Sequence, residues 1–307
     1  MHLYTAAVYT NSYMPGQNLY EKLTDNEKEI AKTAPNILES WHYVGKQKFV
    51  DEMRANGARV FLDSGAFSAF TLGVTLKVSD YCEYIQRNID ILRVEDGNLM
   101  ASVLDGIGDP LQTYRNQKEM EARGCKPLPC FHFGEDENYL EYYVKNYDYI
   151  TIGGMVGKSV KQLSTWLDRI WGKYLVDGSG RAKIKVHAFG ITSFKIMENY
   201  PWYSCDSSSW IQSTAFGVIV TPEHGPIQVS KESPSRKVEG RHITTLSKIE
   251  KDSVFKLIES QGFNYERLSS VYQSRAAYNL WAYREINNQI NKKKSSGQLL
   301  IQKQELF

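Results

Sequence analysis

Short apolar runs of four to eight residues recur along the first two-thirds of the chain, and polar segments with helical spacing separate them. Most of these runs are too short for buried helices, and they are typical of strands in a parallel sheet covered on both faces. The intervening segments include residues 79–92, 109–123 and 160–174. The runs comprise residues 3–9, 37–44, 59–62, 99–104, 128–133, 149–152, 184–189 and 202–205.

This alternation predicts an α/β fold, in the form of a (β/α)8 TIM-like barrel over residues 1–221 with additional C-terminal helices. About eight strand–helix repeats within roughly 220 residues favour a closed barrel over an open doubly wound sheet. A G-x-G-x-x-G loop after the first strand, which would indicate a dinucleotide-binding sheet, is missing from the sequence.

The C-terminal part of the chain has a different pattern. Residues 216–221 form one more strand-like run, and a loop rich in Pro, Ser and Gly follows at 222–241. Helical spacing at 246–260 and 265–290 predicts two helices, so residues 222–290 are expected to form a loop and helices packed on the barrel. Residues 291–307 are expected to form a loosely ordered tail.

Charge and cysteine content limit the classes of function. The net charge is only +2, but residues 236–307 carry 13 Lys and Arg against 7 Asp and Glu, so this part is basic. A basic segment indicates either a solvated helical surface or a contact with a polyanion. The four cysteines include no C-x-x-C pair, which indicates a reducing compartment without a zinc ribbon. We therefore expect a cytoplasmic chain with no bound metal and no cofactor. No long apolar segment or signal peptide is present in the sequence, so no membrane partner is expected.

Three carboxylates follow directly on predicted strands. Asp63, Asp105 and Asp206 stand at strand ends, beside loops of Gly and Ser whose backbone N–H groups can approach a ligand closely. Each Asp alone could simply cap the following helix. Three such residues together favour a shared site, because the functional side chains of a barrel lie at the carboxyl ends of its strands. A pair of carboxylates suits glycosyl transfer, and a third could accept hydrogen bonds from a purine.

Four segments resemble motifs of the tRNA-guanine transglycosylase family, in the same order. Residues 61–67 (FLDSGAF) resemble the DSGGFQ signature, and residues 152–157 (IGGMVG) resemble the GGLAVGE loop, shortened by one residue. Residues 187–191 (HAFGI) are similar to the HLMGVG-type strand end, and Cys205-Asp206 is similar to the FDC segment. The likeness covers about half of the chain.

The resemblance implies a barrel enzyme that exchanges guanine for a 7-deazaguanine base without cutting the nucleic-acid backbone. By motif, Asp206 would be the nucleophile, Asp63 the general acid and base, and Asp105 the group that binds the edge of the base. Phe189 would stack on the base, and His132 stands where the family usually has Gln. The base pocket would be lined by Ser64, His132, Gly153, Gly154, Met155, Phe189 and Gly190.

The departures from the family pattern point to a DNA substrate. The CxCxxC zinc signature that follows the nucleophile in tRNA-acting enzymes is absent, and Ser-Ser-Ser-Trp follows Asp206. This zinc-free pattern resembles the DpdA-type 7-deazaguanine DNA-modifying transglycosylases of phages and bacterial genomic islands. The resemblance implies that the partners are DNA, with a flipped or single-stranded target guanine, and a free base such as 7-cyano-7-deazaguanine. A homodimer is possible by analogy with the tRNA-acting enzymes.

Four basic residues are the predicted contacts to the nucleic-acid backbone, where phosphate binding is electrostatic. They are Arg236, Lys237, Arg241 and Arg275. Two alternatives stay open: the same chemistry on tRNA, and a catalytically silent barrel that only binds nucleic acid. Metal-dependent hydrolysis is disfavoured, because His132 and His187 stand alone on their strands without an H-x-H pair.

Overall fold

A seven-stranded parallel sheet forms the centre of the first of two compact units. The structure is a computed structural model and describes residues 1–33 and 36–295. The first unit comprises Met1–Thr10, Asn36–Ser207 and the chain from Ile290 on, and the second comprises Asn11–Pro35 and Ser208–Gln289. The sequence predicts that the barrel ends at residue 221, whereas the structure groups residues 208–221 with the second unit.

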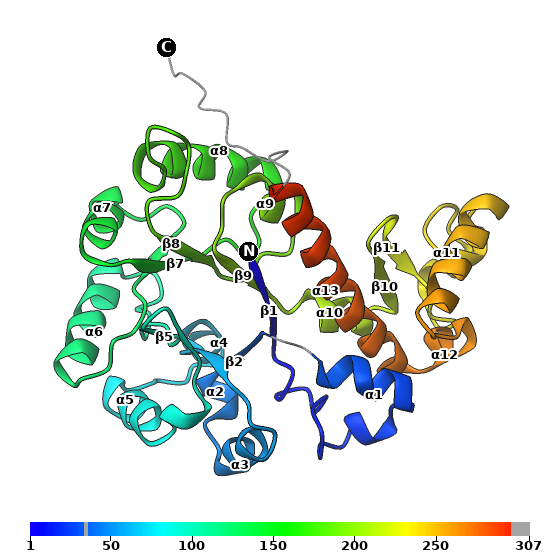
Figure 1. The fold of residues 1–307 in the computed structure, drawn as a ribbon, viewed down its shortest axis with the longest axis horizontal. Coiled ribbons are helices and arrows are strands. Elements are labelled where there is room, and N and C mark those ends of the chain that lie inside the picture. The colour runs from blue at the N-terminus through cyan, green and yellow to red at the C-terminus, as the bar shows by residue number, and fades with distance from the viewer. Residues whose placement is uncertain (34–35, 296–307) are drawn as a thin grey trace. The chain divides into compact units, whose positions relative to one another are not determined.

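The strands of the sheet follow the order β3-β2-β1-β9-β8-β7-β6, and every neighbouring pair is parallel. All their carboxyl ends therefore lie at one edge of the curled sheet (Figure 1). The strands are β1 (His2–Ala6), β2 (Ile37–Ser40), β3 (Val60–Asp63), β6 (Cys130–His132), β7 (Tyr149–Gly153), β8 (Lys185–Ala188) and β9 (Ser204–Ser207).

Helices cover the outer face of this sheet (Figure 1). Local sequence accounts for several of their starts. Asp109 caps α6 by accepting the backbone N–H of Gln112, and Ser159 forms a capping box with Gln162 at the start of α8. The helices are α2 (Trp41–Val44), α3 (Gln47–Ala55), α4 (Ala66–Thr71), α5 (Val78–Arg87), α6 (Pro110–Ala122), α7 (Glu137–Asn146), α8 (Val160–Ile170) and α9 (Phe194–Asn199).

The α/β class predicted from the sequence is confirmed, but regular strand pairing among the described residues does not close the sheet. Its two edges are β3 and β6. The run expected as a strand at 99–104 instead begins in a small hairpin of β4 (Val94–Glu95) and β5 (Asn98–Leu99). It continues between the two edges through isolated parallel bridges, Leu62 with Ala101 and Ser102 with Leu128. The expected strand at 37–44 ends at Ser40, where α2 begins.

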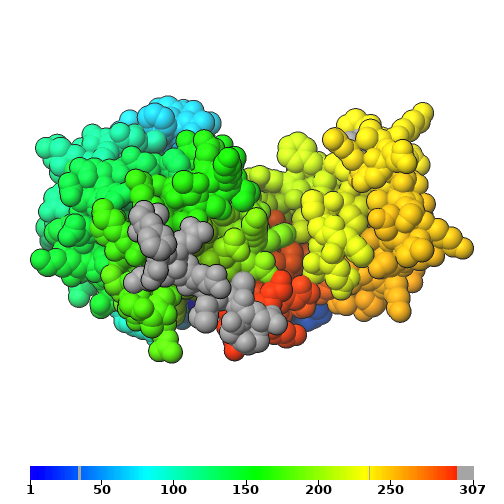
Figure 2. Space-filling model, turned by 90° about the horizontal axis from the view of Figure 1, so that it is seen from above, coloured from blue at the N-terminus to red at the C-terminus, as the bar shows by residue number. Residues whose placement is uncertain are grey.

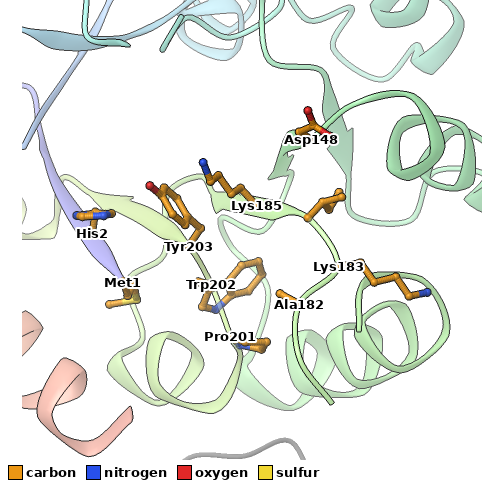
Figure 3. A pocket seen from close by; sticks show the side chains of 10 residues that line it. Met1, His2, Asp148, Ala182, Lys183, Lys185, Pro201, Trp202 and Tyr203 are labelled. Carbon is orange, nitrogen blue, oxygen red and sulfur yellow. The ribbon is translucent and has the colours of Figure 1, made fainter. Parts of the chain in front are cut away.

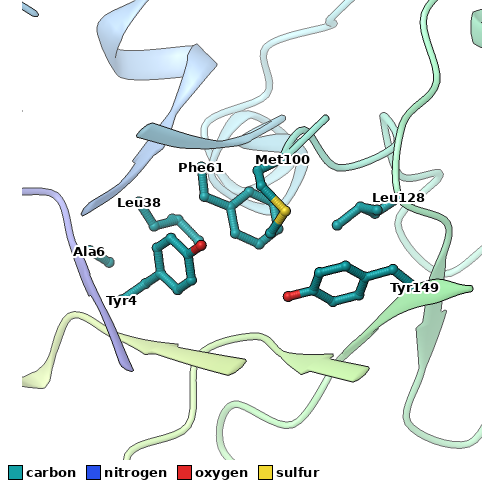
Figure 4. Packing of buried hydrophobic residues seen from close by; sticks show 7 residues of the cluster. All are labelled: Tyr4, Ala6, Leu38, Phe61, Met100, Leu128 and Tyr149. Carbon is teal, nitrogen blue, oxygen red and sulfur yellow. The ribbon is translucent and has the colours of Figure 1, made fainter. Parts of the chain in front are cut away.

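Apolar side chains from successive strands fill the inside of the curl (Figure 4). The rings of Tyr4 and Phe61 meet edge to face with 5.4 Å between their centroids. The hydroxyl of Tyr4 donates to Glu95, and that of Tyr149 lies 2.7 Å from Ser204 Oγ, so these buried polar groups are paired. The interior is therefore a packed core and not a pore. The cluster consists of Tyr4, Ala6, Leu38, Phe61, Met100, Leu128 and Tyr149.

The second unit combines a two-stranded antiparallel sheet with helices. The predicted helix at 265–290 is interrupted at Val271, and its second part runs on to Ser295. Residues 291–295 are therefore helical and not part of a loose tail, while 296–307 lie outside the described residues. The elements are α1 (Asp25–Lys32), α10 (Ser209–Ala215), β10 (Val218–Thr221), β11 (Gly225–Gln228), α11 (Lys248–Ser260), α12 (Tyr265–Ser270) and α13 (Tyr272–Ser295), of which the part from Ile290 on is grouped with the first unit. No helix among the described residues is both long and apolar enough to cross a membrane.

The side chain of Asn279 joins three of these elements. Its Oδ1 accepts the backbone N–H of Val220 at 2.8 Å. Its Nδ2 donates to the carbonyls of Trp210 and Val218 and to Thr214 Oγ1. Asn279 is fully buried, so water cannot replace these bonds if the amide is removed.

We predict that Asn279→Ala lowers the free energy of unfolding by about 2–4 kcal/mol, because it leaves several buried polar groups unpaired. Urea denaturation measures the change. Asn288→Ala, at an exposed position of the same helix, is the matched control and should change stability by less than about 0.5 kcal/mol. Equal stability of the two variants would contradict this role for Asn279.

Candidate active site

The three predicted carboxylates lie in one electrostatic neighbourhood at the carboxyl ends of the strands. Asp63 ends β3, Asp206 lies in β9, and Asp105 follows the bridged segment next to β3. Burial raises the pKa of Asp63 to about 6; the hydrogen bond from Ser40 opposes this rise, and the negative charges of Asp105 and Asp206 add to it. Because both charges act on Asp63, the three residues belong to one region of the first unit.

Hydrogen bonds hold the Asp63 carboxylate from two sides. Ser40 Oγ donates to Oδ2 at 2.7 Å, and the backbone N–H of Gly65 donates to the same oxygen at 3.0 Å. Ser102 Oγ lies 3.4 Å from Oδ1. Gly65 has a φ of 74°, and a Cβ there would lie 2.6 Å from His42 Cβ, so the turn that caps Asp63 requires glycine.

Asp206 is held differently. Its Oδ1 accepts the backbone N–H of Gly190 at 2.9 Å and lies 3.3 Å from His187 Nε2. The other nitrogen of His187 lies 2.6 Å from Ser204 Oγ, and both of these residues are fully buried. Ser204 therefore orients the imidazole and is not placed to act as a nucleophile. The contacts with Gly190 and His187 are both made by Oδ1 of Asp206.

The residues predicted to line a base pocket differ in their access to solvent. Ser64 is fully buried, with its backbone N–H bonded to Ser102, and Met155 is almost fully buried, so neither offers much surface to a ligand. Phe189 is partly buried between the rings of His187 and Phe61, with centroid distances of 4.6 and 5.7 Å. Gly153 is buried, Gly190 is partly buried, and Gly154 is exposed.

His132 and Asp105 belong to a cluster that also contains two residues missed at the sequence level. His132 Nε2 lies 3.5 Å from Asp105 Oδ2 and 3.5 Å from Cys130 Sγ, and Nδ1 lies 2.9 Å from Glu135 Oε1. Burial lowers the pKa of His132, but the charges of Cys130 and Asp105 outweigh it and raise the pKa overall. The signal that could have revealed Cys130 is the C-x-H spacing, because alternate residues of a strand share one face.

A further buried carboxylate, Glu39, lies in β2 beside Ser40. Burial raises its pKa to about 7, against hydrogen bonds from Thr10 Oγ1 and from the backbone N–H groups of residues 8–10. The backbone N–H of Tyr9 donates to Oε1 at 2.6 Å. Glu39 thus fixes the segment after β1 in place. The sequence feature that could have indicated this role is the position of Glu39, a single acidic residue within an apolar run.

The predicted nucleic-acid contacts fall into two groups. Arg236, Lys237 and Arg241 are exposed, in a segment on the surface of the second unit (yellow in Figure 2). Arg275 is only 7% exposed, and its guanidinium donates to the backbone carbonyls of Leu268 and Thr214. The prediction that Arg275 contacts phosphate is therefore wrong, because helix spacing alone did not show that this arginine faces the interior.

A cavity of about 460 Å³ lies at the opposite end of the strands (Figure 3). His2 begins β1, Lys185 begins β8, and Tyr203 precedes β9, so its wall is formed at the amino ends of the strands. The Lys185 ammonium pairs with Asp96 and lies 4.9 Å from the centroid of the Tyr203 ring. The three carboxylates do not line this cavity, so it is separate from the candidate active site.

No protein-family model matches this chain, and no curated protein matches it.

We predict that Asp63→Asn stabilises the protein above about pH 7, by up to about 3 kcal/mol, with a gain that vanishes near pH 4. The folded pKa of Asp63 is raised, from 3.8 to about 6, so the wild type loses stability as the pH rises through this window and Asp63 ionises. Chemical denaturation of both proteins across this pH range measures the difference.

Asp109→Asn is the control for this pH dependence, because Asp109 is an exposed helix cap and Asn caps equally well. A difference between wild type and Asp63→Asn that does not change with pH would contradict the raised pKa.

Proposed function

We propose that the protein is a base-exchanging transglycosylase that replaces guanine in DNA with a 7-deazaguanine such as 7-cyano-7-deazaguanine. The observation that carries the proposal is the pair Asp63 and Asp206, two carboxylates in one region whose surroundings suit different tasks. Such a division between two carboxyl groups is what glycosyl transfer requires. The four motifs that resemble the transglycosylase family supply the nature of the substrate.

In this proposal Asp206 is the nucleophile. The Gly190 N–H and His187 hold its Oδ1, and Oδ2 attacks the anomeric carbon of the sugar. The bond from this carbon to guanine breaks as the new bond forms, which gives a covalent glycosyl–enzyme intermediate and releases the base. The incoming base then attacks the same carbon from the side that guanine left, and the bond to Asp206 breaks. The fixed orientation of the nucleophile contributes to the rate, because the entropy cost of bringing the reacting atoms into position has already been met on folding.

Asp63 is the general acid and base. A pKa of about 6 allows this carboxyl to gain and lose a proton near neutral pH, which an ordinary aspartate does poorly. The hydrogen bonds from Ser40 and Gly65 keep the carboxylate in one orientation while its protonation changes.

Asp105 is the residue that binds the edge of the base. Its Oδ1 is buried and has no hydrogen-bond partner among the described residues. A buried acceptor without a partner is costly, and the N1–H or amino group of guanine would satisfy it. Phe189 would contact the face of the base, with Gly154 and Gly190 at the rim of the site.

We also propose that the curled sheet is a (β/α)8 barrel in which residues 100–103 are the remaining strand. Two backbone hydrogen bonds support this: Leu62 N–H to Met100 C=O at 2.9 Å on one side, and Val103 N–H to Leu128 C=O at 3.0 Å on the other. With this segment included, the strands follow one another around the barrel in chain order. The proposed site would then occupy the carboxyl end of the barrel.

DNA is the favoured nucleic acid because the zinc signature of the tRNA-acting enzymes is missing from the sequence. The exposed Arg236, Lys237 and Arg241 suit phosphate contacts, which lose affinity as the salt concentration rises. Attack on the sugar carbon requires a target nucleotide that is flipped out or already single-stranded.

The purified protein should incorporate radiolabelled guanine into single-stranded DNA and release the label again when unlabelled 7-cyano-7-deazaguanine is added. Scintillation counting of precipitated DNA measures both steps, and unmodified tRNA serves as the parallel substrate. Incorporation into tRNA but not DNA would overturn the choice of substrate. Binding of DNA without incorporation into either nucleic acid would identify a silent barrel and overturn the enzymatic proposal.

Asp206→Asn should lower the exchange rate by at least about a thousandfold, because the amide is a poor nucleophile. The Asp109→Asn variant described above should retain the wild-type rate. Circular dichroism of Asp206→Asn should match the wild type, since Asn can still accept the Gly190 N–H. Near-normal turnover of folded Asp206→Asn would show that another group is the nucleophile.

A further inference from the structure

The cluster of Asp105, Cys130 and His132 contains a thiol, that of Cys130, which base exchange does not use. One ligand atom from each of these residues lies within 4.8 Å of the other two. Cys130 is 1% exposed, and the transglycosylase proposal gives its thiol no role. A carboxylate, a thiol and an imidazole gathered at one point are a ligand set that zinc accepts.

Two of the three distances between ligand atoms match a tetrahedral zinc site. With bonds of about 2.3 Å to sulfur and about 2.0–2.2 Å to nitrogen and oxygen, a tetrahedron has edges of roughly 3.4–3.6 Å between ligand atoms. Two edges are given by the structure: His132 Nε2 to Cys130 Sγ, and His132 Nε2 to Asp105 Oδ2, each 3.5 Å. The third edge, between Asp105 and Cys130, lies within 4.8 Å, so an ion bound by all three residues would draw these two ligands no more than about 1.4 Å closer together.

The surroundings of His132 orient it as a metal ligand. Glu135 Oε1 lies 2.9 Å from Nδ1, and Oε2 of the same carboxylate accepts the backbone N–H of His132 at 2.9 Å. A carboxylate on one imidazole nitrogen fixes the ring so that the other nitrogen faces the metal. This contact leaves Nε2 directed at Cys130 and Asp105.

A glycine on the neighbouring strand provides the space. His132 is paired in register with Gly153 of β7. A Cβ at Gly153 would lie 3.0 Å from His132 Cδ2 and 3.3 Å from Cys130 Sγ. A side chain at this position would therefore press on two of the three ligands.

We propose that Asp105 Oδ2, Cys130 Sγ and His132 Nε2 bind a zinc ion, with a fourth position open to water or to a ligand. The site goes beyond the proposed base exchange and does not depend on it. It also differs from the sequence-based expectation of no metal, which rested on the absence of C-x-x-C and H-x-H pairs and did not consider a cysteine and a histidine on one strand. With Oδ2 on the ion, Oδ1 of Asp105 stays available to a base.

The probe is Co²⁺, added to protein stripped of metal with a chelator. One equivalent per chain should bind and produce a thiolate-to-cobalt charge-transfer band together with the visible bands of four-coordinate Co²⁺, and Zn²⁺ should displace it. Cys130→Ser should abolish the charge-transfer band and weaken binding by at least about a hundredfold. Cys125→Ser, at another buried free cysteine, is the matched control and should leave the spectrum unchanged.

Glu135→Gln keeps all three ligands and should weaken Zn²⁺ binding by about 10–100-fold. Because Glu135 is only partly buried, this variant also tests the site if Cys130→Ser fails to fold. The proposal is overturned if cobalt gives no thiolate band, or if folded Cys130→Ser or Glu135→Gln binds metal as the wild type does. In that case His132 would only form ion pairs with the carboxylates of Asp105 and Glu135. Since the readout is spectroscopic, its failure would leave the base-exchange assay unaffected.

Discussion

The placement of three carboxylates in a largely buried region at one end of a parallel sheet is the constraint on which the rest of the site depends. Each carboxylate is accommodated by a different partner. Asp63 keeps a proton more readily than an ordinary aspartate, Asp206 is held by a backbone N–H and an imidazole, and Asp105 faces His132. Burying the Asp63 carboxyl near two other carboxylates costs folding free energy when Asp63 ionises, and proteins retain such costly groups chiefly where function requires them.

The fold makes this arrangement possible by directing all strands the same way. Most side chains inside the curl are apolar, and the buried polar groups of Tyr149, Ser204 and His187 are bonded to one another. At the amino ends, the β4–β5 hairpin brings Oε1 of Glu95 to the Tyr4 hydroxyl and to Arg93, while Oε2 of Glu95 is buried without a hydrogen-bond partner among the described residues. At the carboxyl ends, Gly65 and Gly190 bring backbone N–H groups to Asp63 and Asp206. At the carboxyl ends, Oδ1 of Asp105 also remains without a hydrogen-bond partner among the described residues, and it is the oxygen available to a ligand there.

Most of the sheet could be predicted because buried parallel strands carry near-continuous apolar runs, as residues 149–152 and 184–189 do. The end of β2 at Ser40 could not be predicted, because apolar residues continue on both sides of it through residues 37–44. Arg275 and Glu39 were unpredictable as buried groups, because their pairing depends on segments distant in the sequence. The three aspartates were found from their positions at strand ends. Cys130 and Glu135 were missed because their significance depends on Asp105, which a separate segment brings to them.

In the proposed mechanism Asp206 forms a covalent bond to the sugar, and this bond can be detected in the mass of the denatured protein. Wild-type protein incubated with a short guanine-containing DNA strand, without an incoming base, is quenched in acid and digested. We expect a population heavier by the strand less one guanine, with the added mass on the peptide that contains Asp206. An unmodified protein, or a modification on any other residue, would contradict this mechanism.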